Sequence, residues 1–197
     1  MGIATETLKM ARIAGMDASD ATDTMTASLR GFNMELNQTS AQRIDDVYSK
    51  LAQITASDTQ EISTAMSKTA SLASQAGMDI EQTATLLAKM IETTRESPEN
   101  LGTALKTIIA RFQNITKDPM KEFSDDSGAY SYNKVDEALQ SVGIQMKDSK
   151  GDFKGFYDVI DELSQKWDGL SQKQKVYIAT QAAGSRRNEC CPLLSAA

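Results

Sequence analysis

The residues of this chain that could carry out acid–base or metal chemistry are acidic residues, which occur in three clusters. The clusters are Asp45-Asp46, Asp125-Asp126 and the group Asp158, Asp161 and Glu162. Neighbouring carboxylates can hold a cation or exchange protons with a substrate. The third cluster, however, lies on the polar side of a predicted amphipathic helix, where charged residues are expected in any case. These carboxylates therefore predict no catalytic residue.

Residues 147–152, Lys-Asp-Ser-Lys-Gly-Asp, come nearest to a calcium-binding pattern. They lack the regularly spaced oxygen ligands and the closing glutamate of an EF-hand loop. We therefore expect a solvated turn here. The sequence predicts no metal-binding residue and no cofactor-binding residue.

The sequence contains no histidine, which removes several classes of active site. Neither a Ser-His-Asp nor a Cys-His arrangement can form within the chain, nor can a zinc site that uses histidine. There is no Gly-x-Ser-x-Gly elbow and no phosphate-binding glycine-rich loop. Ser40, Ser97 and Ser171 fit helix capping instead. We do not predict an enzyme, and a Ser-Lys or carboxylate site without a known motif is the alternative.

The basic, aromatic and sulfur-containing residues also fit structural roles. Arg186-Arg187 is interpreted as a favourable contact with the negative end of a helix. Trp167 lies on an apolar stripe and is predicted to be part of the core. Methionines at apolar positions are expected to fill gaps beside small alanines. These methionines are Met25, Met66 and Met90.

Apolar residues recur at helical spacing along most of the chain, which predicts an all-α fold of short amphipathic helices. One narrow stripe consists of Ile44, Val47, Leu51 and Ile54. Glycines and capping residues follow one another at short intervals, so we expect the helices to fold back as helical hairpins. Because many core positions are alanine, the helical layers should be thin.

The ends of several helices are marked by short motifs. Residues 14–17, Ala-Gly-Met-Asp, recur as residues 76–79. In each copy we expect glycine to end one helix in the left-handed region and aspartate to begin the next. Gln82 and Gln174 each stand three residues after a capping residue, as in a capping box.

The helical periodicity is interrupted at residues 117–133, which predicts a linker or mobile surface loop. Residues 1–116 are predicted to be a helical region of about five helices. Residues 134–187 are predicted to be a small helical subdomain. Within it, alternating residues near 144–154 predict one small β-hairpin. Residues 188–197 form an atypical tail.

The chain carries 27 acidic and 21 basic residues, a net charge of −6. Because phosphate repels an acidic chain, we expect no sequence-independent binding of nucleic acid. No stretch approaches the roughly 20 apolar residues of a membrane-spanning helix, and the first residues do not resemble a signal peptide. Cys190 and Cys191 are adjacent and cannot cross-link distant segments.

Four groups of residues, taken in order, resemble the core region of tail tape-measure proteins from long-tailed bacteriophages and related prophages. The groups are 76–84 (AGMDIEQTA), 101–109 (LGTALKTII), 138–144 (ALQSVGI) with Gly151, Phe153, 158–160 and Lys166-Trp167, and 179–186 (ATQAAGSR). In order and spacing they cover roughly residues 10–187. The run that follows Arg187 departs from the family pattern.

The resemblance implies a structural role in tail assembly and tail length determination. Members of this family occupy the lumen of the growing tail tube and set its length by their own extent. The implied partners are tail tube proteins and tail assembly chaperones, with self-association as a further contact. The implied location is the virion tail, and the host cytoplasm during assembly. Family members are usually several times longer, so we expect a fragment, a truncated gene or a frameshifted product.

A second interpretation is a stand-alone helical interaction or scaffold module with an unknown partner. Its similarity to the family would then arise from helices rich in alanine, serine and threonine. Genes for tube proteins and tail chaperones upstream of this gene would favour the first interpretation. No catalytic residue carries over from the family, because the matching region contains none.

Overall fold

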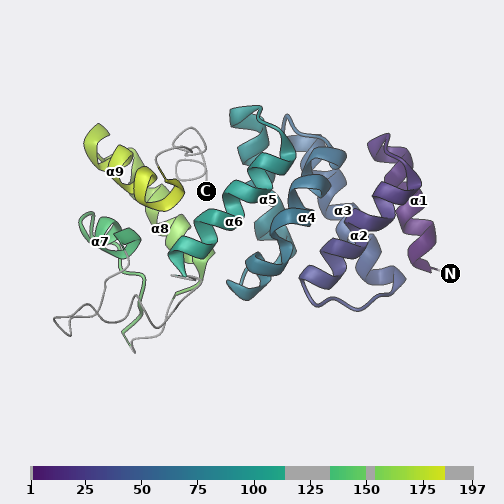
Figure 1. The fold of residues 1–197 in the computed structure, drawn as a ribbon, viewed down its shortest axis with the longest axis horizontal. Coiled ribbons are helices and arrows are strands. Elements are labelled where there is room, and N and C mark those ends of the chain that lie inside the picture. The colour runs from purple at the N-terminus through teal and green to yellow at the C-terminus, as the bar shows by residue number, and fades with distance from the viewer. Residues whose placement is uncertain (1, 114–133, 150–153, 185–197) are drawn as a thin grey trace. The chain divides into compact units, whose positions relative to one another are not determined.

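The computed structural model describes residues 2–113, 134–149 and 154–184. These residues form nine α-helices and no strand (Figure 1), which confirms the predicted all-α class. The chain divides into two compact units, residues 1–106 (unit 1) and 107–197 (unit 2). The boundary falls inside α6, so that helix contributes to both units.

Unit 1 contains five complete helices and the first part of a sixth. They are α1 (Gly2–Ala14), α2 (Ala18–Gly31), α3 (Gln38–Ile54), α4 (Thr59–Gln75), α5 (Ile80–Thr94) and α6 (Pro98–Phe112). Helices two apart in the sequence pack together, α1 on α3, α2 on α4 and α3 on α5. The neighbours α1 and α2, and α4 and α5, also pack on each other, so the chain folds back as the short helices predict.

Small residues let these helices approach closely. A Cβ atom added to Gly102 in α6 would lie 2.3 Å from the backbone oxygen of Ala65 in α4. A Cβ atom on Gly31, at the end of α2, would lie 2.5 Å from the Cβ of Ala70. Backbone therefore lies against its neighbour at both crossings, with little apolar side chain between the helices.

The repeated Ala-Gly-Met-Asp motif ends one helix and begins the next, as predicted. Gly15 and Gly77 have φ values of +67° and +78°, in the left-handed region that favours glycine. The amide of Met16 donates to the carbonyl of Ala11, and the amide of Met78 donates to that of Ala73, each at 3.1 Å. This pattern is the Schellman motif of helix C-termini.

Unit 2 contains the end of α6 and three further helices. They are α7 (Lys134–Gln140), α8 (Phe156–Trp167) and α9 (Gln172–Ala183). Helix α7 packs on α9. Phe112 and Phe156 meet edge to face, with ring centroids 4.9 Å apart. The predicted apolar face of α8 is buried at Val159, Ile160 and Leu163.

The predicted β-hairpin near 144–154 is not confirmed. Within the described residues this segment contains no strand, although the amide of Lys154 donates to the carbonyl of Met146 at 2.8 Å. The alternation was too short to specify paired strands, and an isolated two-stranded hairpin is only marginally stable. Residues 150–153 lie outside the described part of the chain.

The predicted division of the chain stays a prediction. The proposed linker at 117–133 and the tail at 188–197 lie outside the described residues, as do Asp125-Asp126, Arg186-Arg187 and Cys190-Cys191. In residues 2–112 the structure has six helices, where about five were expected. No helix in the described ranges is long and apolar enough to cross a membrane.

Candidate functional site

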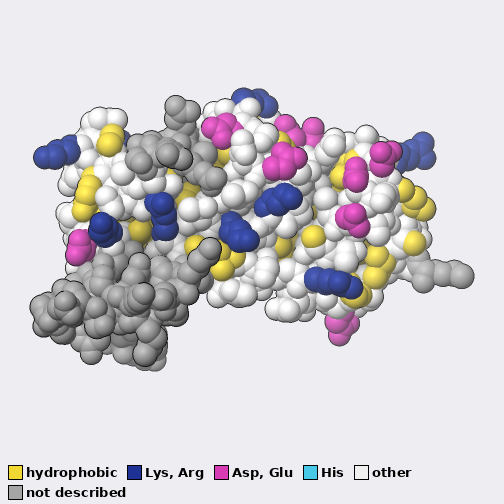
Figure 2. Space-filling view, in the orientation of Figure 1, with side chains coloured by type: hydrophobic (Ala, Val, Ile, Leu, Met, Phe, Trp, Pro, Cys, Tyr) yellow, Lys and Arg dark blue, Asp and Glu magenta, His cyan; other side chains and the backbone are white. Residues whose placement is uncertain are grey.

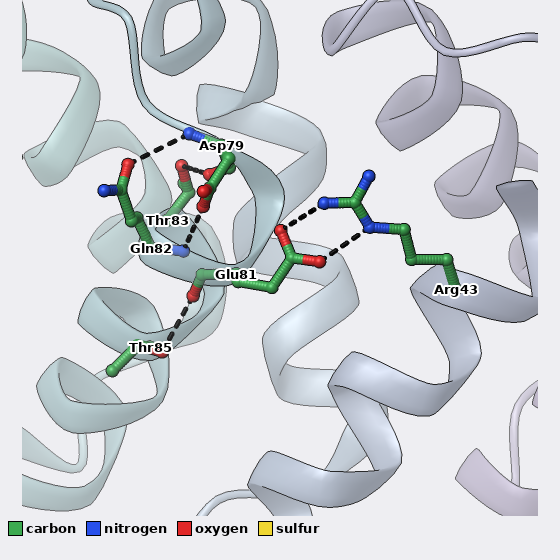
Figure 3. Close-up of polar contacts among 6 residues, drawn as sticks. All are labelled: Arg43, Asp79, Glu81, Gln82, Thr83 and Thr85. Atoms are coloured by element: carbon green, nitrogen blue, oxygen red, sulfur yellow. Dashed lines mark hydrogen bonds and ion pairs between the residues drawn. The ribbon is translucent and has the colours of Figure 1, made fainter.

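The first family-like segment forms the junction between α4 and α5 (Figure 3). Asp79 caps α5, because its carboxylate accepts the amide of Gln82 at 2.7 Å. The Gln82 side chain in turn accepts the amide of Asp79 at 3.1 Å, which completes the predicted capping box. The hydroxyl of Thr83 donates to the carbonyl of Asp79 at 2.8 Å. These residues fix where α5 begins.

The same segment is tied to α3 by an ion pair. The Arg43 guanidinium donates from Nε and Nη2 to the two carboxylate oxygens of Glu81, at 2.6 and 2.7 Å. This two-point contact lowers the pKa of Glu81 and fixes the relative orientation of α3 and α5. Both side chains are about half exposed, so the pair contributes at most about 1 kcal/mol.

A groove of about 490 Å³ lies beside this ion pair, between α3 and α5. Its lining residues are Asp46, Val47, Lys50, Leu51, Glu81 and Thr85. Val47 and Leu51 are less exposed than Asp46 and Lys50. The groove therefore has an apolar interior and a charged edge, which suits an apolar side chain of a partner rather than bond chemistry.

A buried polar cluster lies where α3 packs on α1 and α2. Asp45 is 7% exposed and neither of its carboxylate oxygens has a hydrogen-bond partner among the described residues. Glu6, on α1, is 2% exposed and accepts hydrogen bonds from Lys9 and Gln38. Tyr48 is fully buried, and its hydroxyl lies 2.8 Å from that of Ser28 on α2. Burial, followed by the nearby charge of Glu6, raises the pKa of Asp45 to about 7.

The other acidic residues considered as candidate sites do not form a shared site with Asp45. Asp46 is exposed and lines the groove, whereas Asp45 is buried. Asp161 accepts a hydrogen bond from Gln165 at 2.8 Å, and Glu162 pairs with Lys154. In the described ranges, no group of three or more acidic, Cys or His residues could hold a metal ion.

The capping predictions hold at two of three serines. Ser171 forms a capping box with Gln174, and the hydroxyl of Ser97 accepts the amide of Asn100. Ser40 does not cap α3, which begins two residues earlier. Asn37 occupies the cap position and accepts the amide of Ser40 at 2.9 Å. Either residue type can cap, so the sequence alone did not separate the two positions.

Trp167 is half-buried rather than part of the core, which corrects the prediction. It is the last residue of α8, and the ammonium of Lys175 lies 5.7 Å from the centre of its ring. An aromatic ring at a helix end can keep one face for a cation, which an apolar stripe does not reveal. The three methionines predicted to fill the core are fully buried: Met25, Met66 and Met90.

The burial of Asp45 was not predicted from the sequence. The predicted stripe of α3 placed Val47 and Ile54 toward the core, but Ile54 is 64% exposed. The buried face consists instead of Ala41, Ile44, Asp45, Tyr48 and Leu51. The spacing of Ala41, Ile44, Tyr48 and Leu51 is also helical, and this was the signal available in the sequence.

The other family-like groups also lie at helix contacts and helix ends. Gly102 is the residue of α6 that lies against the backbone of α4. Gly143 has a φ of +75° after α7, and the amide of Ile144 donates to the carbonyl of Leu139 at 3.0 Å. Gly184 ends α9, and the guanidinium Nη1 of Arg111 donates to the carbonyl of Gln181. Their shared role is to shape the helical chain.

Comparisons with known proteins agree with this structural role. The family described as "Phage-related minor tail protein" matches residues 1–184. The chain is also 26% identical over 168 residues to a protein named "Tape measure protein" from Pneumococcus phage Dp-1. This match covers 85% of the chain and 13% of that relative, so the chain spans a small part of the relative's length. No solved structure matches.

Both matches name tail proteins rather than enzymes, and they confirm the resemblance to tape-measure proteins seen in the sequence motifs. The family match extends over almost the whole chain, including every helix described above. The chain therefore belongs to the phage-related minor tail protein family.

Proposed function

We propose that this chain acts in the virion tail as part of a tape measure, which sets tail length from within the tube during assembly. The observation that carries the proposal is the 26% identity to a tape measure protein over 85% of the chain. The family-like residues support it, because they cap helices and pack backbones rather than surround a reactive group. A ruler needs a reproducible length more than a reactive site.

The proposed partners are tail tube proteins and tail assembly chaperones, met in the host cytoplasm during assembly. The groove beside the Arg43–Glu81 pair offers an apolar interior with a charged edge, as small protein contacts often do. The net charge of −6 suits a protein that lies in a passage for DNA without holding it. Residues 1–116 and 134–187 would be the parts joined by a linker at 117–133.

The test is an in-frame deletion in the phage gene that encodes this chain. Removing residues 59–94, which form α4 and α5, should shorten the assembled tail. If the ruler is extended and helical in the tube, the loss is about 1.5 Å per residue, or about 50 Å in all. Electron microscopy of negatively stained tails measures this length directly.

A length-neutral replacement is the matched control. Residues 59–94 are exchanged for an unrelated helical sequence of equal length, which should leave tail length unchanged if only extent matters. Tails of normal length after the deletion would contradict the ruler function. Tails shortened equally by the deletion and by the neutral exchange would do so as well.

The second candidate is a stand-alone helical interaction module, and the α3–α5 groove is the observation that favours it. Such a module would not set length, so deleting α4 and α5 would abolish a partner contact without a graded change in the tail. A point substitution in the groove, Val47→Asp, separates the two functions. Under the ruler function this variant should form tails of normal number and normal length, whereas under the module function it should form fewer tails, of normal length, because the partner contact is lost.

A further inference from the structure

Two carboxylates are buried where α1 packs on α3. The Glu6 carboxylate on α1 is satisfied, because it accepts hydrogen bonds from Lys9 at 2.9 Å and from Gln38 at 3.1 Å. Asp45 on α3 is also buried, but neither of its carboxylate oxygens has a hydrogen-bond partner among the described residues. An ionised carboxylate in such a position is strongly unfavourable. The geometry therefore favours the protonated form of Asp45.

The charges around Asp45 do not offset its burial. Glu6 on α1 and Asp46 on α3 both disfavour its ionised form. Lys9 favours that form, but its ammonium is already bonded to both oxygens of Glu6. Tyr48, one turn along α3, is held by the Ser28 hydroxyl of α2. Burial and the Glu6 charge together raise the pKa of Asp45 to about 7.

The other helices packed against α3 bring no free cation to this place. Their ionisable side chains are exposed to solvent or are engaged elsewhere within the described residues. They are Asp20, Asp23 and Arg30 on α2, Glu61 and Lys68 on α4, and Glu81, Lys89 and Glu92 on α5. An ionised Asp45 would therefore be repelled by Glu6. The positive charge that favours it is that of Lys9, which already pairs with Glu6.

Helix α1 is held to the rest of unit 1 by little apolar surface. Its buried residues are Glu6, Thr7 and Met10, of which Met10 alone is apolar. Leu8 and Ile13 are each 60% exposed. A helix with so few buried apolar contacts opens at a low free energy compared with the core of its domain. One proton is therefore enough to change how often α1 separates.

We propose that the protonation state of Asp45, buried near Glu6, controls how firmly α1 packs on α3. With a proton on Asp45, α1 stays packed on α3. When that proton is lost, α1 separates from α3 more often while α2 to α5 stay folded, and each opening exposes the face of α1 that carries Met10. This is a conformational device within unit 1, and it does not depend on the proposed ruler function.

The direction of the pH effect follows from proton binding. Once α1 has separated, Asp45 is hydrated and its pKa returns toward the ordinary 3.8. Between about pH 4 and pH 7 the packed state thus holds one more proton than the separated state. Opening of α1 becomes more frequent as pH rises through this window, by up to about tenfold per pH unit, and levels off above it.

Hydrogen exchange on the full chain measures this opening. The protection factor of amides 7–14 is obtained from pH 5 to pH 8, each against an unstructured reference at the same pH. We expect it to fall up to about tenfold per pH unit as far as pH 7, and then to level off. Amides 84–94 of α5 should show no comparable slope. A flat profile in α1, or an equal slope in α5, would overturn the proposal.

Two variants test the two carboxylates. Asp45→Asn removes the titrating group and should make α1 protection independent of pH, whereas Asp23→Asn, at an exposed position of α2, should behave as the unmodified chain. Glu6→Gln removes the opposing charge and frees Lys9 for Asp45, so the fall in protection should move to lower pH. The proposal is overturned if the protection of α1 still falls with pH in Asp45→Asn, or if Glu6→Gln does not move that fall to lower pH.

Discussion

Single glycine and alanine residues decide how closely the helices of unit 1 approach. At Gly102 the α6 backbone lies so near Ala65 of α4 that no side chain fits between them. The neighbouring Thr103 is exposed and lies on the outer side of the same helix. A glycine in the middle of a helix is unfavourable by about 1 kcal/mol relative to alanine. This loss is offset because Gly102 allows the backbones of α4 and α6 to pack closely.

Gly102→Ala is therefore expected to destabilise the chain although alanine is the better helix former. The added methyl would stand 2.3 Å from the Ala65 carbonyl oxygen, so α4 and α6 must move apart. Overpacking of this kind costs about 1–3 kcal/mol, against about 1 kcal/mol regained from helix propensity. We expect a net loss of about 1 kcal/mol in the free energy of unfolding, measured by urea denaturation with circular dichroism.

Thr103→Ala is the matched control, because it adds the same residue one position away where nothing is crowded. It should change the free energy of unfolding by less than about 0.5 kcal/mol. Equal effects of the two substitutions would mean that α6 does not depend on contact with α4. A stabilising Gly102→Ala would mean that the two backbones separate readily.

The helix ends of the repeated motif make different use of the same residue type. Asp17 and Asp79 both occupy the N-cap position, before α2 and α5 respectively. The Asp79 carboxylate accepts an amide hydrogen, whereas that of Asp17 makes no capping hydrogen bond. The two copies of the motif therefore end the preceding helix in the same way, but only Asp79 caps the following helix with a hydrogen bond.

Asp79→Ala should lower the free energy of unfolding by about 1 kcal/mol, because the amide of Gln82 loses its acceptor. Asp17→Ala should have a clearly smaller effect, limited to the interaction of its charge with the helix dipole. Thermal denaturation of the two variants side by side measures the difference. Equal losses would contradict the capping geometry described at α5.

The all-α class and most helix starts could be predicted, because caps and glycine ends act within a few residues. The buried face of α3 was not predicted, although the spacing of Ala41, Ile44, Tyr48 and Leu51 indicated it. Tyr48 is fully buried, and its hydroxyl lies 2.8 Å from that of Ser28 on α2. Asp45 lies on the same buried face of α3, whereas Ile54 is exposed. Periodicity within one helix does not reveal which residues of a second helix lie against it. The proximity of Glu6 on α1 and Asp45 on α3 could therefore not be predicted from the sequence.

The molecule as a whole carries a net negative charge, and its charged side chains are dispersed over the surface. On the face shown in Figure 2, basic and acidic side chains are interspersed over unit 1. Several of the cations are already committed, as Arg43 is to Glu81 and Lys89 is to Glu92. Binding to DNA requires a surface on which cations act together and release counterions from phosphate.

We therefore expect the chain not to bind duplex DNA at physiological salt, about 0.15 M. Fluorescence anisotropy of a labelled duplex measures this. A variant that carries Lys at the exposed positions Asp23, Glu35 and Asp168 provides the comparison, since each exchange raises the net charge by two and the total rises from −6 to zero. It should bind weakly at low salt and release DNA as salt increases. Salt-sensitive binding by the unmodified chain would contradict the idea that its acidity keeps a tail lumen free for DNA.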